Sequence, residues 1–325
     1  MKKWLLALSV AVSAATSASD FTTERENVSQ WIDRVSTEHN IPREDLTLLL
    51  GQAERKQSIL DAIARPAEKV LTWEEYRQIF MSGSRAQKGA EFWQENAEAL
   101  QRASDEIGVE PEYIVAIIGV ETRYGRIMGS YRVIDALATL AFDYPPRSRF
   151  FSSELEQFVL LTRESGKEPT SLYGSYAGAM GYGQFMPSSY RAYARDFSGD
   201  GVADIWEDRG DAIASVANYF KRHGWVAGQP VVISLSPSDS ADTETDNQIG
   251  LSRTMADIEA SGFIPSSVVA GDTEANLFYF EGEADAEYYA GLQNFYTITR
   301  YNRSAFYAMA VHLLAQEIKR EYTAL

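Results

Sequence analysis

The chain has 325 residues, of which 45% are hydrophobic and 12% aromatic, enough to bury a large core in one to three domains. Its formal charge of −16, from 30 basic and 46 acidic residues, repels phosphate backbones and argues against nucleic acid as a partner. There is no cysteine, which excludes disulfides, thiolate metal sites, a cysteine nucleophile and a lipid anchor on cysteine.

The sequence opens with MKKWLLALSVAVSAATSASD, in which two lysines precede a short apolar stretch and small residues. This pattern predicts a secretory signal peptide over residues 1–18, cleaved after Ala15 or Ala18. The apolar stretch is shorter than the roughly 20 residues that a membrane span needs, and no later stretch reaches that length. We therefore expect a soluble, monomeric protein of the periplasm, with neither a transmembrane nor a lipid anchor.

Helices are expected over most of the chain. Residues 19–110 are polar and amphipathic, as in VSQWIDRVSTEH and AEFWQENAEALQRASDEIG, which predicts an N-terminal helical domain. Pro111 favours a first helical turn and Gly125 a left-handed cap, so a helix of about four turns is expected between them. Further helices are expected in VIDALATLAF, SELEQFVLLTRE and DAIASVANYFKRH.

The pattern changes at Gly228. The segments PVVISL, LFYFEGE, EYYAGL and FYTITRY are short, aromatic and β-branched, which predicts strands, and the acidic stretch SPSDSADTETDNQIG predicts a loop. A last amphipathic helix is expected from Ser304 to Tyr322. The predicted fold class is α+β, mainly α, with a helical body and a small strand-rich insertion near residues 228–300.

Glu121 follows the apolar run YIVAIIGV at the end of an expected helix. Its carboxyl would lie where an apolar helix face opens to a cleft, and desolvation there raises a carboxyl pKa toward the range that a general acid needs. On spacing alone, however, a glutamate at a helix end is more often solvated or ion-paired. Local positive charge for binding a polyanionic polymer would come from nearby arginines: Arg123, Arg126, Arg147 and Arg149.

The segment GSYAGAMGYGQFMPSSY, residues 174–190, alternates glycines with aromatic residues and leads into Gln184. Glycines at this density allow a ligand or a second backbone to approach closely. Tyrosines and an amide suit a polyhydroxylated ligand, because rings stack on sugar faces and the amide bonds hydroxyl or acetamido groups. The alternative is a crossover that only packs helices together. A dinucleotide site is excluded, since the third glycine and the preceding strand are missing.

The segment DFSGDGVADIWE, residues 196–207, has the spacing of an EF-hand calcium loop. Oxygen donors occupy positions one, three, five and nine, a glycine occupies position six and a glutamate position twelve. We expect a structural Ca²⁺ with these ligands: Asp196, Ser198, Asp200, the Val202 carbonyl, Asp204 and Glu207. The alternative is an acidic, solvated turn.

Other chemistries find little support in the sequence. His39, His223 and His312 are isolated and show no zinc-binding spacing. GSYAG is not the nucleophile motif G-x-S-x-G, and there is no phosphate loop. We expect no organic cofactor.

Together these segments resemble the lytic murein transglycosylase B family. The likeness spans most of the mature chain and is carried by ARPAEKVLTWEEYRQIF, VAIIGVETRYGR, GSYAGAMGYGQFMPSS, DFSGDGVADIW and ITRYNRSAFYAMAV. It implies an enzyme that cleaves the β-1,4 bond between N-acetylmuramic acid and N-acetylglucosamine in peptidoglycan glycan strands, leaving a 1,6-anhydromuramoyl end. It implies Glu121 as general acid and then base, with the substrate's C6 hydroxyl as nucleophile, so that a second carboxylate is not required.

The resemblance also implies the substrate-binding residues: Tyr76, Ser175, Gln184, Tyr219, Tyr301, Asn302 and Tyr307. For the tyrosines, packing in a core is the alternative, strongest for Tyr219 and Tyr307. In the family the calcium loop can close through an aspartate beyond position twelve, so Asp211 competes with Glu207. The family fold implies a lysozyme-like catalytic core over residues 111–227, a small inserted antiparallel β domain over 228–300, and a C-terminal helix, 301–325, that returns to the core.

Two other functions stay open. A hydrolytic muramidase would use a second carboxylate, and Asp135, Asp143 and Glu154 are available without a motif around them. A non-catalytic peptidoglycan-binding protein would need no acid at Glu121.

Overall fold

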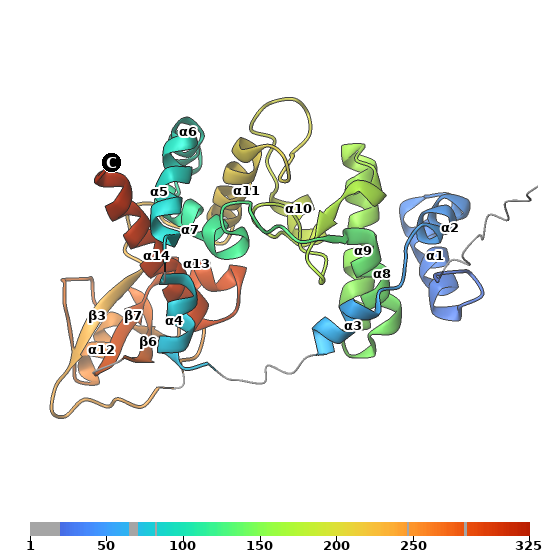
Figure 1. Cartoon of the computed structure of the whole chain (residues 1–325). Coiled ribbons are helices and arrows are strands. Elements are labelled where there is room, and N and C mark those ends of the chain that lie inside the picture. Colours follow the sequence, from blue (N-terminus) through green and yellow to red (C-terminus); the bar gives the residue numbers. More distant parts are fainter. Residues whose placement is uncertain (1–19, 65–70, 82, 246, 283–284) are drawn as a thin grey trace, which may run out of the picture. The chain divides into compact units, whose positions relative to one another are not determined.

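The computed structural model describes residues 20–64, 71–81, 83–245, 247–282 and 285–325 (Figure 1). The predicted signal peptide lies outside the described residues, and the domain boundaries given above stay predictions. Contacts within the chain define two compact units, Met1–Arg55 and Lys56–Leu325, and each is described by itself. Among the described helices, none combines the length and the apolar composition that a bilayer crossing requires.

The first unit contains two helices, α1 (Glu26–His39) and α2 (Arg43–Gly51). Helix α1 is capped by Asn40, which adopts a left-handed conformation with φ of 52°. Its apolar residues recur at helical spacing, so that one stripe is buried with two leucines of α2: Val28, Trp31, Ile32, Val35, Leu46 and Leu50.

The second unit is mainly helical. Its helices are α3 (Gln57–Ala64), α4 (Trp73–Met81), α5 (Arg85–Glu95), α6 (Ala97–Ile107), α7 (Pro111–Thr122), α8 (Val133–Asp143), α9 (Ser148–Ser165), α10 (Pro187–Tyr193), α11 (Arg209–Arg222), α12 (Met255–Ala260), α13 (Gln293–Tyr301) and α14 (Ala305–Thr323). Helices α5 and α6 are separated by Asn96.

Helix α7 forms the centre of the packing and carries Glu121 near its end. It begins with Pro111, as predicted, and nearly all of its side chains are buried. Helix α14 packs against α7, α5 and α4, while α11 packs against α6 and α7. The helix ends two residues earlier than expected, because Arg123 already takes the left-handed cap with φ of 51°, followed by Tyr124 and Gly125 in the same region.

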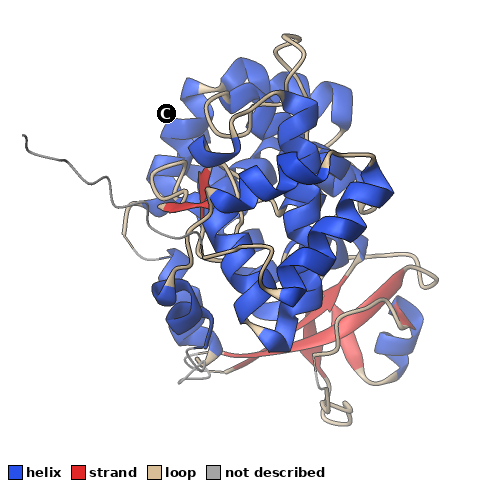
Figure 2. Cartoon of the chain, turned by 90° about the vertical axis from the view of Figure 1, so that its right-hand side faces the viewer, coloured by secondary structure: helices blue, strands red, loops and turns tan. Residues whose placement is uncertain are grey.

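A five-stranded antiparallel sheet of the second unit joins β4 (Arg253–Thr254), β6 (Glu274–Glu281), β7 (Ala286–Gly291), β3 (Val232–Pro237) and β5 (Phe263–Pro265), in that order. Figure 2 shows these strands gathered at one edge of the helices. One face of the sheet packs on the helices through two aromatic pairs. Phe278 contacts Phe295 of α13, and the Phe280 ring lies 4.8 Å, between centroids, from the Trp73 ring of α4. The other face forms a small core with α12.

The predicted strand FYTITRY is wrong, because these residues form helix α13. Phe295, Ile298 and Tyr301 recur every three residues, which places them on one side of a helix, and this period was masked by the β-branched residues between them. The remaining described strands, β1 (Tyr131–Arg132) and β2 (Tyr173–Gly174), form a short antiparallel pair. The mainly helical α+β class predicted from the sequence is confirmed.

Candidate active site

Glu121 is the penultimate residue of α7 and is only partly exposed. The hydroxyl of Tyr307, on α14, donates a hydrogen bond of 2.5 Å to its Oε1 atom. Burial raises the pKa of Glu121 to about 7, against a smaller lowering by the Tyr307 hydrogen bond. A carboxyl of this kind is protonated in a large share of molecules near neutral pH and can give up or accept a proton there.

Three predicted tyrosines surround this carboxyl. Burial raises the pKa of Tyr76, Tyr301 and Tyr307, and the nearby Glu121 charge adds to each of these increases. Tyrosines with raised pKa values stay neutral and act as hydrogen-bond donors. They come from α4, α13 and α14, so the fold brings together residues that lie far apart in the sequence.

The glycine-rich segment is fixed beside Glu121 by backbone contacts. Tyr301 donates a hydrogen bond of 2.6 Å to the carbonyl of Gly183, and a Cβ atom at Gly183 would lie 2.8 Å from the Tyr301 hydroxyl. At Gly174, a Cβ atom would lie 2.2 Å from the carbonyl oxygen of Ala179. The close approach of a second backbone therefore accounts for Gly174, whereas at Gly183 the Tyr301 side chain occupies the space that a Cβ atom would need.

Thr122 is a positioning residue that the sequence did not reveal. Its hydroxyl lies 3.0 Å from the carbonyl of Tyr182 and accepts a hydrogen bond from the backbone N–H of Gly125. These bonds connect the end of α7, next to Glu121, to the glycine-rich segment. A threonine after the glutamate is an ordinary helix residue in a sequence, so only the contacts identify its role.

The remaining predicted residues occupy distinct positions. Ser175 accepts hydrogen bonds from the N–H groups of Ala177 and Ala179, which leaves its own hydroxyl hydrogen suited to an acceptor on a ligand. Gln184 adopts φ of 51° and donates to the carbonyls of Met128 and Gly181.

The last two predicted residues lie near Tyr301. Tyr219 is buried, packs 4.7 Å from the Tyr301 ring and donates to the carbonyl of Arg300, so packing is its visible role. Asn302 follows α13 and is exposed.

The predicted arginines separate into two places. Arg123 and Arg126 line a pocket of about 240 Å³ together with Arg85 and Lys88. Burial lowers the pKa of Arg85, and the neighbouring Arg123 charge lowers it further. Ile79 lines it too, one helical turn from Tyr76 on α4. Arg147 and Arg149 lie elsewhere, with the Arg147 guanidinium 4.5 Å from the centroid of Phe150.

The acidic loop 196–207 is held in place by carboxylates. Asp196 accepts hydrogen bonds from the N–H groups of Gly199 and Gly201, which lower its pKa. Asp211 is fully buried at the start of α11 and accepts from the N–H groups of Phe197, Ser198 and Asp204. It therefore braces the loop from inside, a role that Glu207, which is exposed, does not share.

Asp204, expected at position nine of the calcium loop, is engaged otherwise. Its Oδ2 atom accepts a hydrogen bond of 2.7 Å from Lys167, and its Oδ1 atom accepts from the N–H groups of Trp206 and Glu207. Among the described residues of this loop, there is no group of three acidic side chains whose carboxylate oxygens all lie within 4.8 Å of one another. Of the expected carboxylate ligands, Asp204 is therefore paired with Lys167, whereas Asp196 and Asp200 accept hydrogen bonds from the backbone of the loop itself.

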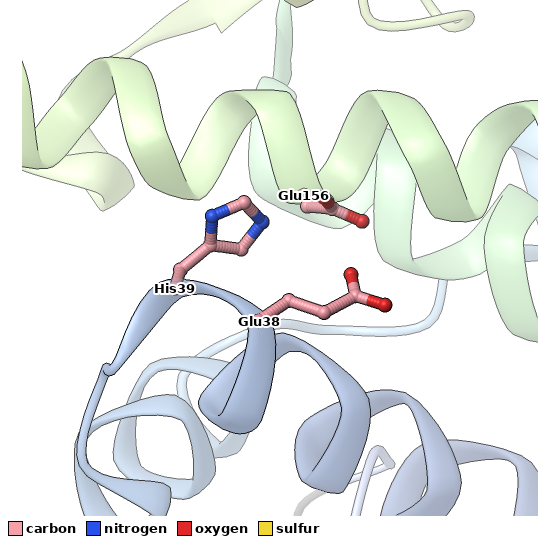
Figure 3. A group of neighbouring side chains, drawn as sticks. All are labelled: Glu38, His39 and Glu156. Carbon is pink, nitrogen blue, oxygen red and sulfur yellow. The ribbon is translucent and has the colours of Figure 1, made fainter.

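The three histidines belong to separate elements. His39 is the last residue of α1, where Figure 3 shows it next to Glu38 on the same helix end. His223 stacks on Tyr219 at 4.0 Å, and His312 shares a hydrogen bond of 3.0 Å with the Tyr113 hydroxyl. Burial lowers the pKa of His312 to about 4, which keeps that ring neutral and structural.

A carboxyl that is partly protonated near neutral pH and lies among tyrosine donors suits the general acid of a glycan-cleaving enzyme. The transglycosylase SLT domain family matches residues 23–316. Membrane-bound lytic murein transglycosylase B of Escherichia coli (strain K12) is 44% identical over 301 residues, which cover 90% of this chain and 82% of that protein.

Solved structures give the same result. Soluble lytic transglycosylase SltB1 from Pseudomonas aeruginosa is 51% identical, with a TM-score of 0.87 over 91% of this chain and 99% of that chain. The Escherichia coli lytic transglycosylase Slt35, solved in complex with calcium, is 43% identical, with a TM-score of 0.85 over 94% of this chain and 96% of that chain. The chain belongs to the transglycosylase SLT domain family, and it is a lytic murein transglycosylase.

Proposed function

We propose that Glu121 carries both proton transfers of the reaction. As an acid it protonates the oxygen that joins the muramoyl C1 atom to N-acetylglucosamine, and the C1–O bond breaks. The C6 hydroxyl of the same muramoyl residue then attacks C1, while the Glu121 carboxylate takes the hydroxyl proton. The products are a 1,6-anhydromuramoyl end and a free N-acetylglucosamine C4 hydroxyl, and no water is consumed.

The observation that carries this proposal is that a single carboxyl serves the site. Burial alone raises the pKa of Glu121, and the Tyr307 hydrogen bond lowers it by less; no acidic residue in the described part of the chain contributes to the increase. Asp135 is paired with Arg132 at 2.8 Å, and Glu154 accepts hydrogen bonds from the N–H and hydroxyl groups of Ser188. A hydrolytic muramidase would need a second carboxylate beside a water; of the three candidates, Asp135 and Glu154 are engaged in these contacts, and Asp143 is the last residue of α8.

Substrate contacts fall to polar groups around Glu121. Tyr76 and Tyr301 border the carboxyl, and Ser175, Gln184 and Asn302 offer a hydroxyl and two amides for the sugar's hydroxyl and acetamido groups. Tyr219 would act through Tyr301, against which it packs. Tyr307 stabilises the carboxylate that forms when Glu121 gives up its proton.

The test of this function is mass spectrometry of the muropeptides that the mature protein releases from purified sacculi. Anhydromuramoyl ends are expected in every released fragment. Reducing ends would instead assign hydrolysis, and an unchanged sacculus with retained binding would assign the binding role.

Replacing Tyr307 with phenylalanine is expected to shift the pH dependence of the reaction upward. The hydrogen bond from Tyr307 lowers the pKa of Glu121, so its loss raises that pKa further above 7. Because the acid must be protonated, the alkaline fall of kcat/KM should move up by about one pH unit, and kcat should fall about tenfold. The matched control is Tyr113→Phe, whose hydroxyl shares a hydrogen bond with the His312 ring outside the site. An alkaline limb that stays in place would contradict the assignment.

We further propose that the loop 196–207 binds Ca²⁺ in a structural role. Asp196, Ser198, Asp200 and the Val202 carbonyl would hold the ion, which supplies positive charge and no redox chemistry. The related Slt35 structure with calcium supports this proposal. Glu207 and Asp211 stay alternatives for the closing ligand.

Calcium is expected to raise the unfolding temperature of the protein, because a ligand at one hundred times its Kd stabilises the folded state by about 2.7 kcal/mol. Asp196→Ala should abolish this increase. Glu207→Gln should change the unfolding temperature only with calcium present if Glu207 is the ligand. Asp211→Asn should lower it in EDTA as well, because Asp211 braces three backbone N–H groups. Equal unfolding temperatures in calcium and EDTA for the parent protein would refute the site.

Export to the periplasm completes the proposal, since peptidoglycan lies there. It rests on the signal pattern of residues 1–18 and is tested by cell fractionation.

A further inference from the structure

The far face of the five-stranded sheet carries a second concavity. A polar groove of about 780 Å³ is lined by residues of the loop after β3 and of strands β4, β6 and β7, among them Thr243, Gln248, Arg253, Tyr279 and Tyr288. This volume lies within the range of pockets that hold small ligands. None of the residues proposed for the reaction lines it.

Strand alternation separates this groove from the active site. Tyr279 lies between Phe278 and Phe280, which point to the opposite face of the sheet and pack on α13 and α4. That opposite face leads toward Glu121, because Phe280 contacts Phe306 and the Phe306 ring lies 5.8 Å from Tyr76. A ligand in the groove therefore occupies a separate site on the same unit.

The groove has a fixed wall and an aromatic floor. Thr245 donates to the carbonyl of Leu277, Asn247 exchanges two hydrogen bonds with the backbone of Tyr279, and the buried Asn276 donates to the carbonyl of Gln248. Tyr279 and Tyr288 are register partners on β6 and β7, with ring centroids 5.4 Å apart. Both rings are partly exposed.

The side chains that line the groove indicate which kind of ligand it can bind. One acid, Glu244, and one base, Arg253, leave the groove without net charge, although the whole chain has a charge of −16. The other polar groups are hydroxyls and amides, which bond sugar hydroxyl and acetamido groups, while tyrosine rings pack on the apolar faces of sugars.

We propose that this groove is an accessory binding site for the glycan strand of peptidoglycan, which holds the enzyme on its polymer while Glu121 acts elsewhere on it. The identity of the strand rests on the proposed function. A short soluble substrate cannot use both sites at once, whereas the polymer can, so the groove raises effective concentration only on the polymer.

The test compares two rates for each variant: degradation of intact sacculi, and cleavage of a soluble tetrasaccharide made of two disaccharide repeats. For Tyr279→Ala the ratio of the first rate to the second should fall about fivefold. Tyr279→Phe, which keeps the ring, should restore the ratio. Tyr322→Ala is the matched control, since it removes a tyrosine that stacks on Trp93 outside the groove.

Gln248→Ala provides a second groove variant should Tyr279→Ala lower stability in thermal unfolding. An unchanged ratio for both groove variants would overturn the proposal. Co-sedimentation of the Glu121→Gln protein with peptide-free glycan strands separates this inference from the catalytic one. Binding that depends on Tyr279 supports the groove even if the parent protein yields no anhydro products. Binding that requires the stem peptides would overturn the assignment to glycan.

Discussion

Replacing Glu121 with glutamine is expected to reduce the release of anhydromuropeptides from sacculi by about a thousandfold or more, since one group supplies both proton transfers. Glutamine keeps the size of the side chain and can still contact the Tyr307 hydroxyl, but it can neither protonate the glycosidic oxygen nor accept the C6 hydroxyl proton. Binding to sacculi should persist, because the surrounding tyrosines and amides are unchanged. The measurement is mass spectrometry of the released fragments, with co-sedimentation as the readout of binding.

The matched control is Glu112→Gln on the same helix. Glu112 is buried at the opposite end of α7, where its carboxylate accepts a hydrogen bond of 2.7 Å from Lys319. This variant should retain activity at temperatures where it is folded. Retention of activity by Glu121→Gln would mean that another group donates the proton, and equal loss in both variants would point to a general effect on α7.

Helix α7 and the three central strands of the sheet, β3, β6 and β7, could be predicted because their signals are local. Pro111 marks the start of α7, and the apolar run after it identifies a buried helix. The end of α7 was harder to predict, because Arg123 takes the left-handed conformation that glycine favours. Helix α13 was mistaken for a strand because tertiary packing of Phe295 on Phe278 outweighs the β-branched composition of the segment.

The candidate site was partly visible in the sequence. Glu121 was identified by its place after an apolar run and by a family resemblance, but its raised pKa depends on burial and on Tyr307, 186 positions away along the chain. No local pattern reveals a contact of that span. The calcium loop shows the converse case: its spacing is clear in the sequence, yet Lys167 engages Asp204, and Asp211 is used as an internal brace.

A second consequence of the raised pKa concerns stability. In the unfolded chain the Glu121 pKa is near 4.5, and in the folded chain it is about 7. The folded protein therefore binds more protons than the unfolded chain between these values, and stability from this carboxyl is fully present below pH 4.5 and is lost as the pH rises through 7. The loss amounts to about 3 kcal/mol at most.

Glutamine at position 121 has no proton to lose. The free energy of unfolding of Glu121→Gln should thus exceed that of the parent protein by about 3 kcal/mol more at pH 8 than at pH 4.5. Urea unfolding followed by tryptophan fluorescence at both pH values measures this difference. Glu112→Gln should instead be less stable than the parent, because it loses the ion pair with Lys319.

A stability difference that does not change with pH would mean that the Glu121 pKa is ordinary in the folded protein, and the acid role would then need another explanation at neutral pH. Burial of the Glu121 carboxyl thus has two effects, one on catalysis and one on stability. The apolar end of α7 keeps the carboxyl protonated for the first proton transfer, and the same desolvation makes the ionised enzyme less stable than its inactive variant. A variant that is inactive yet more stable at pH 8 is the combination expected when a buried carboxyl is retained for catalysis.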